Sequence, residues 1–402
     1  MSIPLLTTKL YIPSQRPNLV PRPRLVARLG EIQRSRHCLT LVSAKAGSGK
    51  TTAVSEWLHQ QEQPAAWLSL DANDNDPRRF CTYLVAALEK LEIKIDQAVL
   101  GRFDTPQMPE AEDLVAELIN NAAASSICFV LVLDDYHLIQ NDWIHQAVGF
   151  LIENQPPEMQ LVLITRVDPP LPLARLRGRG QMTEIRDHDL RFTKEETTQF
   201  LNESMALDLP ADAVSTLEGR TEGWIAGLQM AAISMWGRRQ DGDLGAFVEA
   251  FGGTNRYILD YLMEEVLNQQ APAIQSFLIE TSILDRMCGA LCDAVRFDRP
   301  ETPGGSPPTA VQRGQGESHE GQATLSHLER TNLFVIPLDD ERKWFRYHHL
   351  FADQLQSTLR QRRSAEEIRE LHRRAGRWHQ SEGSLEEAMS HAMAAQDFER
   401  AA

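Results

Sequence analysis

The segment that most constrains the fold of this chain is residues 41–52, LVSAKAGSGKTT. Its apolar start predicts a strand, and the apolar residues that follow it recur at helical spacing. A glycine-containing loop between a strand and a helix can turn successive backbone N–H groups toward one anion, and the helix N-terminus adds its positive dipole. The segment therefore predicts a phosphate-binding loop with these residues: Ala46, Gly47, Ser48, Gly49, Lys50, Thr51 and Thr52.

Two side chains of this loop carry the predicted chemistry. Lys50 can reach the β- and γ-phosphates of a nucleotide, and the Thr51 hydroxyl can coordinate Mg²⁺. Ala44 stands where the pattern G-x-x-x-x-G-K-[ST] has its first glycine, whereas Gly47 and Gly49 are both present. The alternative interpretation is a glycine-rich surface turn beside a strand.

Two further apolar runs end in charged residues. Residues 129–135, FVLVLDD, end in Asp134, which is predicted to hold Mg²⁺ directly or through water, and in Asp135. Asp135 is predicted to orient or deprotonate the attacking water, although an acid at a strand end also commonly starts a turn. Residues 159–166 end in Arg166, which is predicted to sense the γ-phosphate. The alternative for Arg166 is an arginine that caps a strand end in solvent.

Residues 1–191 are predicted to form an α/β nucleotide-binding domain. Short, branched apolar runs are typical of strands buried on both faces of a parallel sheet, and here they alternate with helical patterns. The predicted strands are residues 38–44, 65–70, 127–135 and 159–166, with a fifth at 182–186. In such a doubly wound sheet the ligand binds at the carboxyl ends of the strands.

The pattern becomes helical after residue 191. Residues 192–262 are predicted to form a helical domain, which opens on a capping box of Thr193 and Glu196. Residues 263–363 show three short helices and a β-hairpin, a winged-helix pattern. Within it, residues 298–322 are rich in proline and glycine and are predicted to be a disordered insertion. Residues 364–402 are predicted to begin a helical repeat array; because such arrays need several units, we expect a truncation.

Charge and targeting signals limit the class of function. The chain has 41 Lys and Arg against 56 Asp and Glu, which gives a net charge of −15. That balance argues against direct DNA binding through the winged helix, which is one alternative, because phosphate binding needs a positive field. There is no secretory signal and no apolar run of about 18 residues, so a cytoplasmic protein with no membrane contact is expected.

The order of these blocks resembles the MalT-type regulators, which belong to the STAND class of signal-transduction ATPases and carry LuxR-type DNA-binding tails. The similar segments are TTKLYIPSQRPNLVPRPRL, AKAGSGKTT, LVLDDYHLI, ITRVDPPLPLARLRGRGQMTEIRDHDLRFTKEE, EGWIAGLQMAA and WFRYHHLFADQL. The resemblance implies an AAA+/STAND-like P-loop NTPase sheet, followed by helical, winged-helix and TPR-like modules.

The resemblance also implies a switch. Such proteins rest as ADP-bound monomers, and an inducer on the helical arm permits exchange of ADP for ATP, self-association and transcription activation. By similarity, His348 contacts the β-phosphate of ADP, and residues 20–24, Arg24 included, lie near the adenine. The alternative for His348 is a strand end packed beside Phe351. Lys45 stands where the family usually has proline, so a looser start of the loop is expected.

The leading hypothesis is an ATP/ADP-binding switch module that uses Mg²⁺ and hydrolyses ATP slowly, rather than a metabolic enzyme. Its expected partners are an unknown small-molecule or protein inducer, further copies of itself in the ATP state, and DNA only through a C-terminal domain missing here. The alternative is a P-loop ATPase enzyme or motor with steady turnover.

Overall fold

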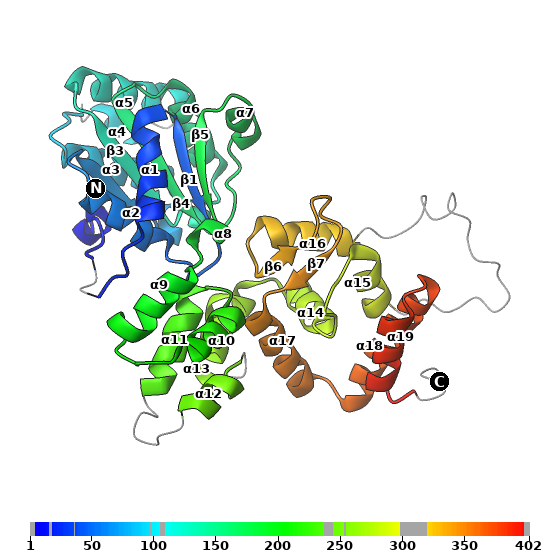
Figure 1. Cartoon of the computed structure of the whole chain (residues 1–402). Helices are drawn as coiled ribbons and strands as arrows, with labels where there is room; N and C mark the ends of the chain where they lie inside the picture. Colours follow the sequence, from blue (N-terminus) through cyan, green and yellow to red (C-terminus); the bar gives the residue numbers. More distant parts are fainter. Residues whose placement is uncertain are drawn as a thin grey trace. The chain divides into compact units, whose positions relative to one another are not determined.

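The computed structural model describes residues 5–15, 18–35, 37–95, 98–104, 109–236, 244–252, 255–297 and 320–397. The chain divides into two compact units (Figure 1). Unit 1 comprises residues 1–208 and 224–226, and unit 2 comprises residues 209–223 and 227–402. The predicted division into four domains remains a prediction, because the compact units of the structure number two.

A five-stranded parallel sheet forms the centre of unit 1 (Figure 1). Its strands are β1 (Leu39–Ser43), β2 (Ala65–Ser69), β3 (Phe129–Asp134), β4 (Met159–Thr165) and β5 (Met182–Arg186). All five lie where the apolar runs predicted them, so the α/β fold is confirmed. The strand order is β2-β3-β4-β1-β5, which puts β4 between β1 and β3.

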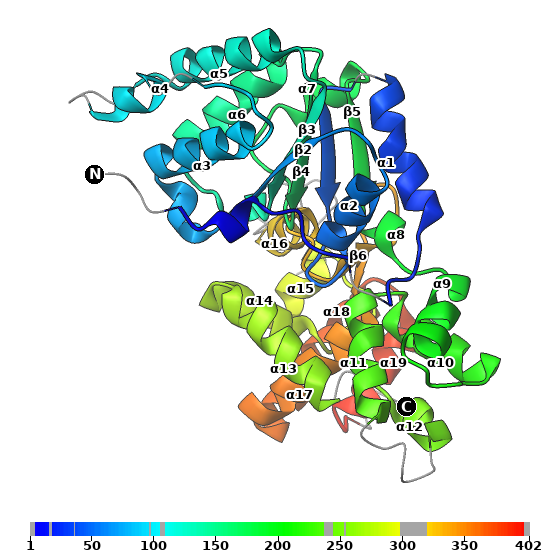
Figure 2. The same ribbon diagram turned by 90° about the vertical axis from the view of Figure 1, so that its left-hand side faces the viewer.

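Helices cover both faces of the sheet, with α3, α5 and α6 on one side and α1 and α2 on the other (Figure 2). The helices of unit 1 are α1 (Pro23–Ser35), α2 (Lys50–His59), α3 (Pro77–Glu89), α4 (Ala98–Gly101), α5 (Ala111–Ser125), α6 (Asp142–Asn154), α7 (Leu173–Gly178), α8 (Asp187–Leu190) and α9 (Lys194–Thr198). A π-helical turn, Gln199–Ser204, follows α9.

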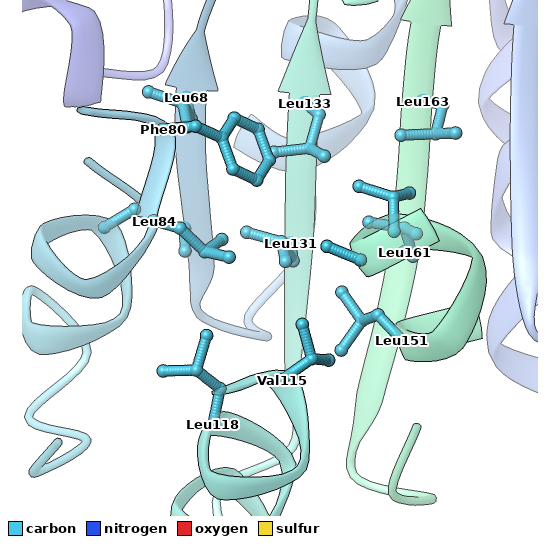
Figure 3. Packing of buried hydrophobic residues seen from close by; sticks show 14 of the residues in the cluster. Leu68, Phe80, Leu84, Val115, Leu118, Leu131, Leu133, Leu151, Leu161 and Leu163 are labelled. Carbon is cyan, nitrogen blue, oxygen red and sulfur yellow. The ribbon is translucent and has the colours of Figure 1, made fainter. Parts of the chain in front are cut away.

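The alternation of side chains along β3 explains why both faces are covered. Leu131 and Leu133 point into the cluster with α3, α5 and α6 (Figure 3), whereas Val130 and Val132 pack in the cluster with α1 and α2. Each fully buried aliphatic side chain contributes about 2 kcal/mol to stability. The sheet is therefore a rigid base for the loops at its carboxyl edge.

Unit 2 is mostly helical. Its helices are α10 (Ala211–Thr221), α11 (Ile225–Trp236, whose first two residues belong to unit 1), α12 (Leu244–Ala250), α13 (Arg256–Glu265), α14 (Pro272–Thr281), α15 (Gly289–Arg296), α16 (Glu320–Arg330), α17 (His349–Arg362), α18 (Ala365–Ser381) and α19 (Leu385–Ala394). The strands β6 (Val335–Pro337) and β7 (Phe345–Tyr347) pair as an antiparallel hairpin after α14, α15 and α16. This confirms the predicted winged-helix pattern.

The insertion predicted at residues 298–322 falls mainly on residues 298–319, which lie outside the described ranges. Its expected end is corrected, because α16 begins at Glu320. The Gly321 N–H donates a hydrogen bond of 2.9 Å to the Asp293 carboxylate. At Gly289, a Cβ atom would lie 2.6 Å from the Gln322 nitrogen, so the two helices approach closely here. These contacts order the residues that composition alone assigned to the insertion.

At the C-terminal end, α18 and α19 form a helical hairpin, whereas the helical repeat array predicted to begin here stays a prediction. Ser364 and Glu367 make a capping box at the start of α18, and Gly383 turns the chain between the helices at a φ of +80°. Residues 398–402 lie outside the described part. Within the described part, none of the helices combines the length and apolar character that a bilayer crossing requires.

Candidate functional site

The loop between β1 and α2 has the backbone that its glycines predict. Gly47 and Gly49 both have left-handed φ values, +70° and +80°, which glycine adopts without a steric penalty. At Gly49, a Cβ atom would also lie 2.7 Å from the Ile225 side chain. The predicted strand–loop–helix unit is therefore present, and position 49 accepts only glycine without a shift of its neighbours.

Residues 224–226, at the start of α11, bind the phosphate-binding loop, and we call this segment the loop cap. The Trp224 indole N–H donates to the Ala46 carbonyl at 3.0 Å, and the Ala226 N–H donates to the Gly47 carbonyl at 3.1 Å. The C=O and N–H groups of a trans peptide point in opposite directions. These two bonds therefore turn the N–H groups of Gly47 and Ser48 away from the loop cap, in the manner of an anion-binding nest.

Lys50, the first residue of α2, carries a buried ammonium group. Its Nζ donates to the Ala44 carbonyl at 2.8 Å and to the Lys45 carbonyl at 2.9 Å. Burial, together with the charge of Arg166, lowers the pKa of Lys50 to about 8 against the opposing effect of the carboxylates Asp135 and Asp134. A poorly hydrated cation of this kind favours an anionic ligand.

Thr51 and Asp134 meet across the carboxyl edge of the sheet. The Thr51 hydroxyl lies 3.2 and 3.1 Å from the two carboxylate oxygens of Asp134, to which it donates. The Asp134 side chain is 3% exposed, and burial, followed by the charge of Asp135, raises its pKa to about 7. The Thr51 hydroxyl and the Asp134 carboxylate offer the hard oxygen ligands that Mg²⁺ prefers. Because burial disfavours a carboxylate whose charge is not balanced, a bound cation would fit this site.

The described residues contain no group of three or more His, Cys, Asp or Glu side chains that could hold a metal ion. A site with few protein ligands is compatible with Mg²⁺, because this ion commonly binds one or two carboxylates together with phosphate oxygens and water. Thr51 and Asp134 are therefore the residues that could hold the cation.

Asp135 directly follows Asp134 at the end of β3, and Arg166 lies at the end of the neighbouring strand β4. Asp135 adopts a left-handed conformation with φ of +57°, and its side chain is 45% exposed. Arg166 follows β4, the strand between β1 and β3, and its charge lowers the pKa of Lys50. The roles of Asp135 with water and of Arg166 with the γ-phosphate remain predictions.

His137 is a residue of this site that the sequence did not single out. Its Nδ1 lies 3.9 Å from an Asp135 oxygen. Burial, together with the charges of Arg166 and Lys50, lowers the pKa of His137 to about 3, so its ring is neutral at neutral pH. Its only signal in the sequence is its place two residues after the acidic pair.

The expectation that Lys45 loosens the start of the loop is wrong. Its side chain is buried, and its Nζ lies 3.5 Å from an Asp187 carboxylate oxygen. Its backbone carbonyl accepts hydrogen bonds from Lys50 and, at 2.9 Å, from the Ser48 hydroxyl. Lys45 therefore ties the start of the loop to α8.

Arg24 is bound by protein groups in unit 1. Its guanidinium makes two hydrogen bonds of 2.9 Å with the Glu196 carboxylate and one of 2.6 Å with the Asp189 carbonyl. Nearby, the Arg22 N–H donates to the Glu56 carboxylate on α2 at 3.1 Å. Residues 20–24 thus contact the helix that starts at the loop, while their contact with adenine remains a prediction.

His348 belongs to unit 2, and its ring is buried. Its Nε2 donates to the Thr221 carbonyl at 3.0 Å, and the Phe334 ring packs edge-on against it, with centroids 5.6 Å apart. The predicted contact with the β-phosphate involves residues of two different units and stays a prediction.

Comparison with known proteins gives three concordant similarities. Residues 263–367 match the family model described as the MalT winged helix domain. The chain is 35% identical over 397 residues to the HTH-type transcriptional regulator MalT of Klebsiella pneumoniae subsp. pneumoniae, and 34% identical over 400 residues to that of Yersinia enterocolitica. Each alignment covers 98% of this chain and 41% of the relative.

Among solved structures, a Walker-type ATPase of Pyrococcus abyssi shares the fold, with a TM-score of 0.52 and 14% sequence identity. The similarity covers 85% of this chain and 97% of that protein. This similarity supports the fold of the chain, and it carries no information about its activity.

Proposed function

We propose that this MalT-like chain is the nucleotide-binding switch module of a transcriptional regulator of the STAND class. In this proposal the module binds ADP and ATP with Mg²⁺ and hydrolyses ATP slowly. Its nucleotide state would control self-association and transcription activation. The chain spans 41% of the length of the MalT relatives that it matches, so the activity of a whole regulator enters only as part of this proposal.

The observation that carries the nucleotide proposal is the arrangement of Lys50, Thr51 and Asp134 around one loop. Thr51 lies within hydrogen-bonding distance of Asp134, and the Lys50 ammonium is tied to the start of the same loop. The pKa of Lys50 is lowered and that of Asp134 is raised, so burial disfavours the charged form of both groups. A bound phosphate group would supply an anion beside Lys50, and its Mg²⁺ would supply a cation beside Asp134.

Each residue has a distinct role in this proposal. The loop N–H groups and Lys50 bind the phosphates, and Thr51 and Asp134 hold Mg²⁺, which when bound neutralises charge on the phosphates. Asp135, half-exposed beside Asp134, orients the water that attacks the γ-phosphate. Arg166 stabilises the γ-phosphate from the strand between the loop and the acidic pair.

The names of the relatives, HTH-type transcriptional regulators, support a role in transcription control. The net charge of −15 disfavours DNA binding by these 402 residues themselves, so we assign DNA recognition to a separate domain of such a regulator. We further propose that an inducer acts through the helical arm that begins at residue 364, and that the protein works in the cytoplasm.

Turnover separates a switch from the alternative of an ATPase enzyme or motor. We expect the purified chain to carry ADP, which mass spectrometry of the released ligand would identify. With ATP and Mg²⁺, we expect far less than one phosphate released per chain per second, because a switch must persist in one state between signals. Sustained turnover at several cycles per second would contradict the switch and favour the alternative.

A further inference from the structure

Asp168 lies two residues after Arg166, in the segment that follows β4, and it binds the ends of two other strands. The Ser43 hydroxyl, at the end of β1, donates to the Asp168 carboxylate at 3.0 Å. The Arg186 guanidinium, at the end of β5, donates to both oxygens of the same carboxylate, and one of these two hydrogen bonds measures 3.0 Å. Asp168 therefore joins the carboxyl ends of three adjacent strands, β4, β1 and β5, and all of these contacts lie within unit 1.

The pair of Asp168 and Arg186 belongs to a larger group of charges at this edge of the sheet. Arg186 also donates to the Glu184 carboxylate at 2.5 Å, and Arg177, on α7, donates to the two Glu184 oxygens at 2.7 and 3.0 Å. Burial alone would raise the pKa of Glu184, but Arg177 and Arg186 lower it. Burial alone would likewise lower the pKa of Arg186, but Asp168 and Glu184 raise it. Arg186 and Glu184 are therefore both charged at neutral pH.

The residues next to Arg166 in sequence are held by hydrogen bonds as well. The Thr165 hydroxyl donates to the Val167 carbonyl at 2.6 Å and accepts from the Val167 N–H at 3.3 Å. The Thr165 carbonyl accepts from the N–H of Ala44, which stands where the loop motif has its first glycine, at 3.3 Å. Together with Asp168, these contacts fix the backbone before and after Arg166 against the strand that leads into the phosphate-binding loop.

The electrostatics of the site explain why the place of Arg166 has to be fixed. Burial, and after it the charge of Arg166, lowers the pKa of both Lys50 and His137, so the guanidinium lies close enough to act on both. Arg166 and Lys50 are two cations, and like charges at close range repel each other. Contacts that fix the backbone on both sides of Arg166 oppose this repulsion. A phosphate group bound near both cations would relieve it.

We infer that Asp168 is a positioning residue for recognition of the γ-phosphate of ATP, because its contacts with Ser43 and Arg186 hold the segment that carries Arg166. This inference rests on the proposed function, in which Arg166 stabilises the γ-phosphate. In this role Asp168 acts through Arg166 rather than on the nucleotide itself. Because ADP has no γ-phosphate, Asp168 contributes to the binding of ATP and not to that of ADP.

The test compares the affinity of the full chain for ADP and for the non-hydrolysable analogue β,γ-imido-ATP, each with Mg²⁺, by isothermal titration. We expect Asp168→Asn to weaken binding of the analogue about 10-fold, because Arg166 loses the alignment that a charged hydrogen bond to the γ-phosphate requires. We expect ADP binding to stay within about twofold, because that contact is not made to ADP. Equal weakening for both nucleotides would indicate general damage to the site, and it would overturn the inference, as would no weakening of either.

The matched control is Glu153→Gln, which removes another carboxylate–arginine pair of unit 1. Glu153, on α6, pairs with Arg175, on α7, and their side chains are 43% and 44% exposed. Exposed pairs contribute little, so we expect this variant to bind both nucleotides within about twofold of the unmodified chain.

A second variant tests the same contact from β5. Arg186→Gln removes the bidentate partner of Asp168, and circular dichroism and the thermal midpoint would show that it is folded. A selective loss of β,γ-imido-ATP binding in folded Arg186→Gln supports the inference. Unchanged affinity for the analogue overturns it, whatever Asp168→Asn does.

Combining variants tests whether Asp168 acts through Arg166. Arg166→Gln alone should weaken binding of β,γ-imido-ATP, and the double variant with Asp168→Asn should bind the analogue about as well as Arg166→Gln alone. Multiplication of the two effects, or unchanged binding in Arg166→Gln, would contradict the inference. An unmodified chain that binds neither nucleotide would instead contradict the proposed function itself.

Discussion

Replacing Asp134 with Asn should make the nucleotide-free protein more stable while removing its ability to use Mg²⁺. The Asp134 carboxyl is almost fully buried, and its pKa is raised from 3.8 to about 7 by burial and by the charge of Asp135. Asn has nearly the same shape, and its oxygen can still accept a hydrogen bond from Thr51 or from the Asp135 N–H. The substitution therefore removes the ionisation of this group with little change in packing.

The size of the effect follows from the difference between the pKa of Asp134 in the folded and unfolded chain. At about pH 4 and below, the folded and unfolded states both bind the proton, so the ionisation of Asp134 does not change the stability. As the pH rises from 4 to 7, the unfolded state loses the proton first, so stability falls, and above pH 7 the difference is constant. At 1.36 kcal/mol per pKa unit, the destabilisation is about 2 kcal/mol at pH 5.5 and about 4 kcal/mol at pH 8.

Urea unfolding of both proteins in EDTA at pH 5.5 and pH 8 measures this difference. We expect Asp134→Asn to be the more stable protein, and its advantage to be larger at pH 8. The control is Asp340→Asn, an exposed acidic residue in the turn between β6 and β7, which should change the unfolding free energy by less than about 1 kcal/mol at both pH values.

Adding Mg²⁺ with ADP should reverse the order, because only a protein that binds the ligand in its folded state gains stability from it. We expect the unmodified chain to be stabilised and Asp134→Asn to gain little. A lower stability of Asp134→Asn in EDTA, or an advantage that does not change between pH 5.5 and pH 8, would refute the reasoning about the buried carboxylate.

Four further substitutions test the remaining roles. Lys50→Met should weaken ADP binding about 100-fold in isothermal titration, because a charged hydrogen bond to phosphate is lost; unchanged affinity would remove Lys50 from the site. Gly49→Ala should destabilise the chain by about 1–3 kcal/mol in urea unfolding, since its φ is +80° and its Cβ would meet Ile225; a neutral effect would contradict the loop geometry. Asp135→Asn should leave ATP binding intact and slow phosphate release about 100-fold or more in a single-turnover assay, and equal rates would exclude it as the water-orienting group. His348→Ala should speed ADP release in a chase experiment if His348 contacts the β-phosphate, and an unchanged rate would argue against that contact.

The sheet and the loop could be predicted because their signals are local. Each strand is a short apolar run buried on both faces, and the loop requires glycine at positions 47 and 49 for its left-handed backbone. The spatial order of the strands has no such local signal. Only the structure puts β4 between β1 and β3, which brings Arg166 near Lys50.

The parts of the site that escaped prediction depend on long-range contacts. Trp224 and Ala46 are 178 residues apart in sequence, and nothing in a helical pattern indicates that an indole N–H binds a distant loop carbonyl. Lys45 was expected to loosen the loop because the resembled family usually has proline there, and its ion pair with Asp187 was missed because Asp187 follows another strand. In both cases the sequence shows the residue type, whereas the partner is set by the packing of the sheet.

Equilibrium binding of ADP to the nucleotide-stripped chain, with Mg²⁺ and with EDTA, tests the central claim most directly. We expect one ADP per chain, bound more tightly with Mg²⁺ than with EDTA, and a large loss of affinity in Lys50→Met. A chain that takes up no adenine nucleotide in the presence of Mg²⁺, or that binds it equally well without Lys50, would contradict the claim.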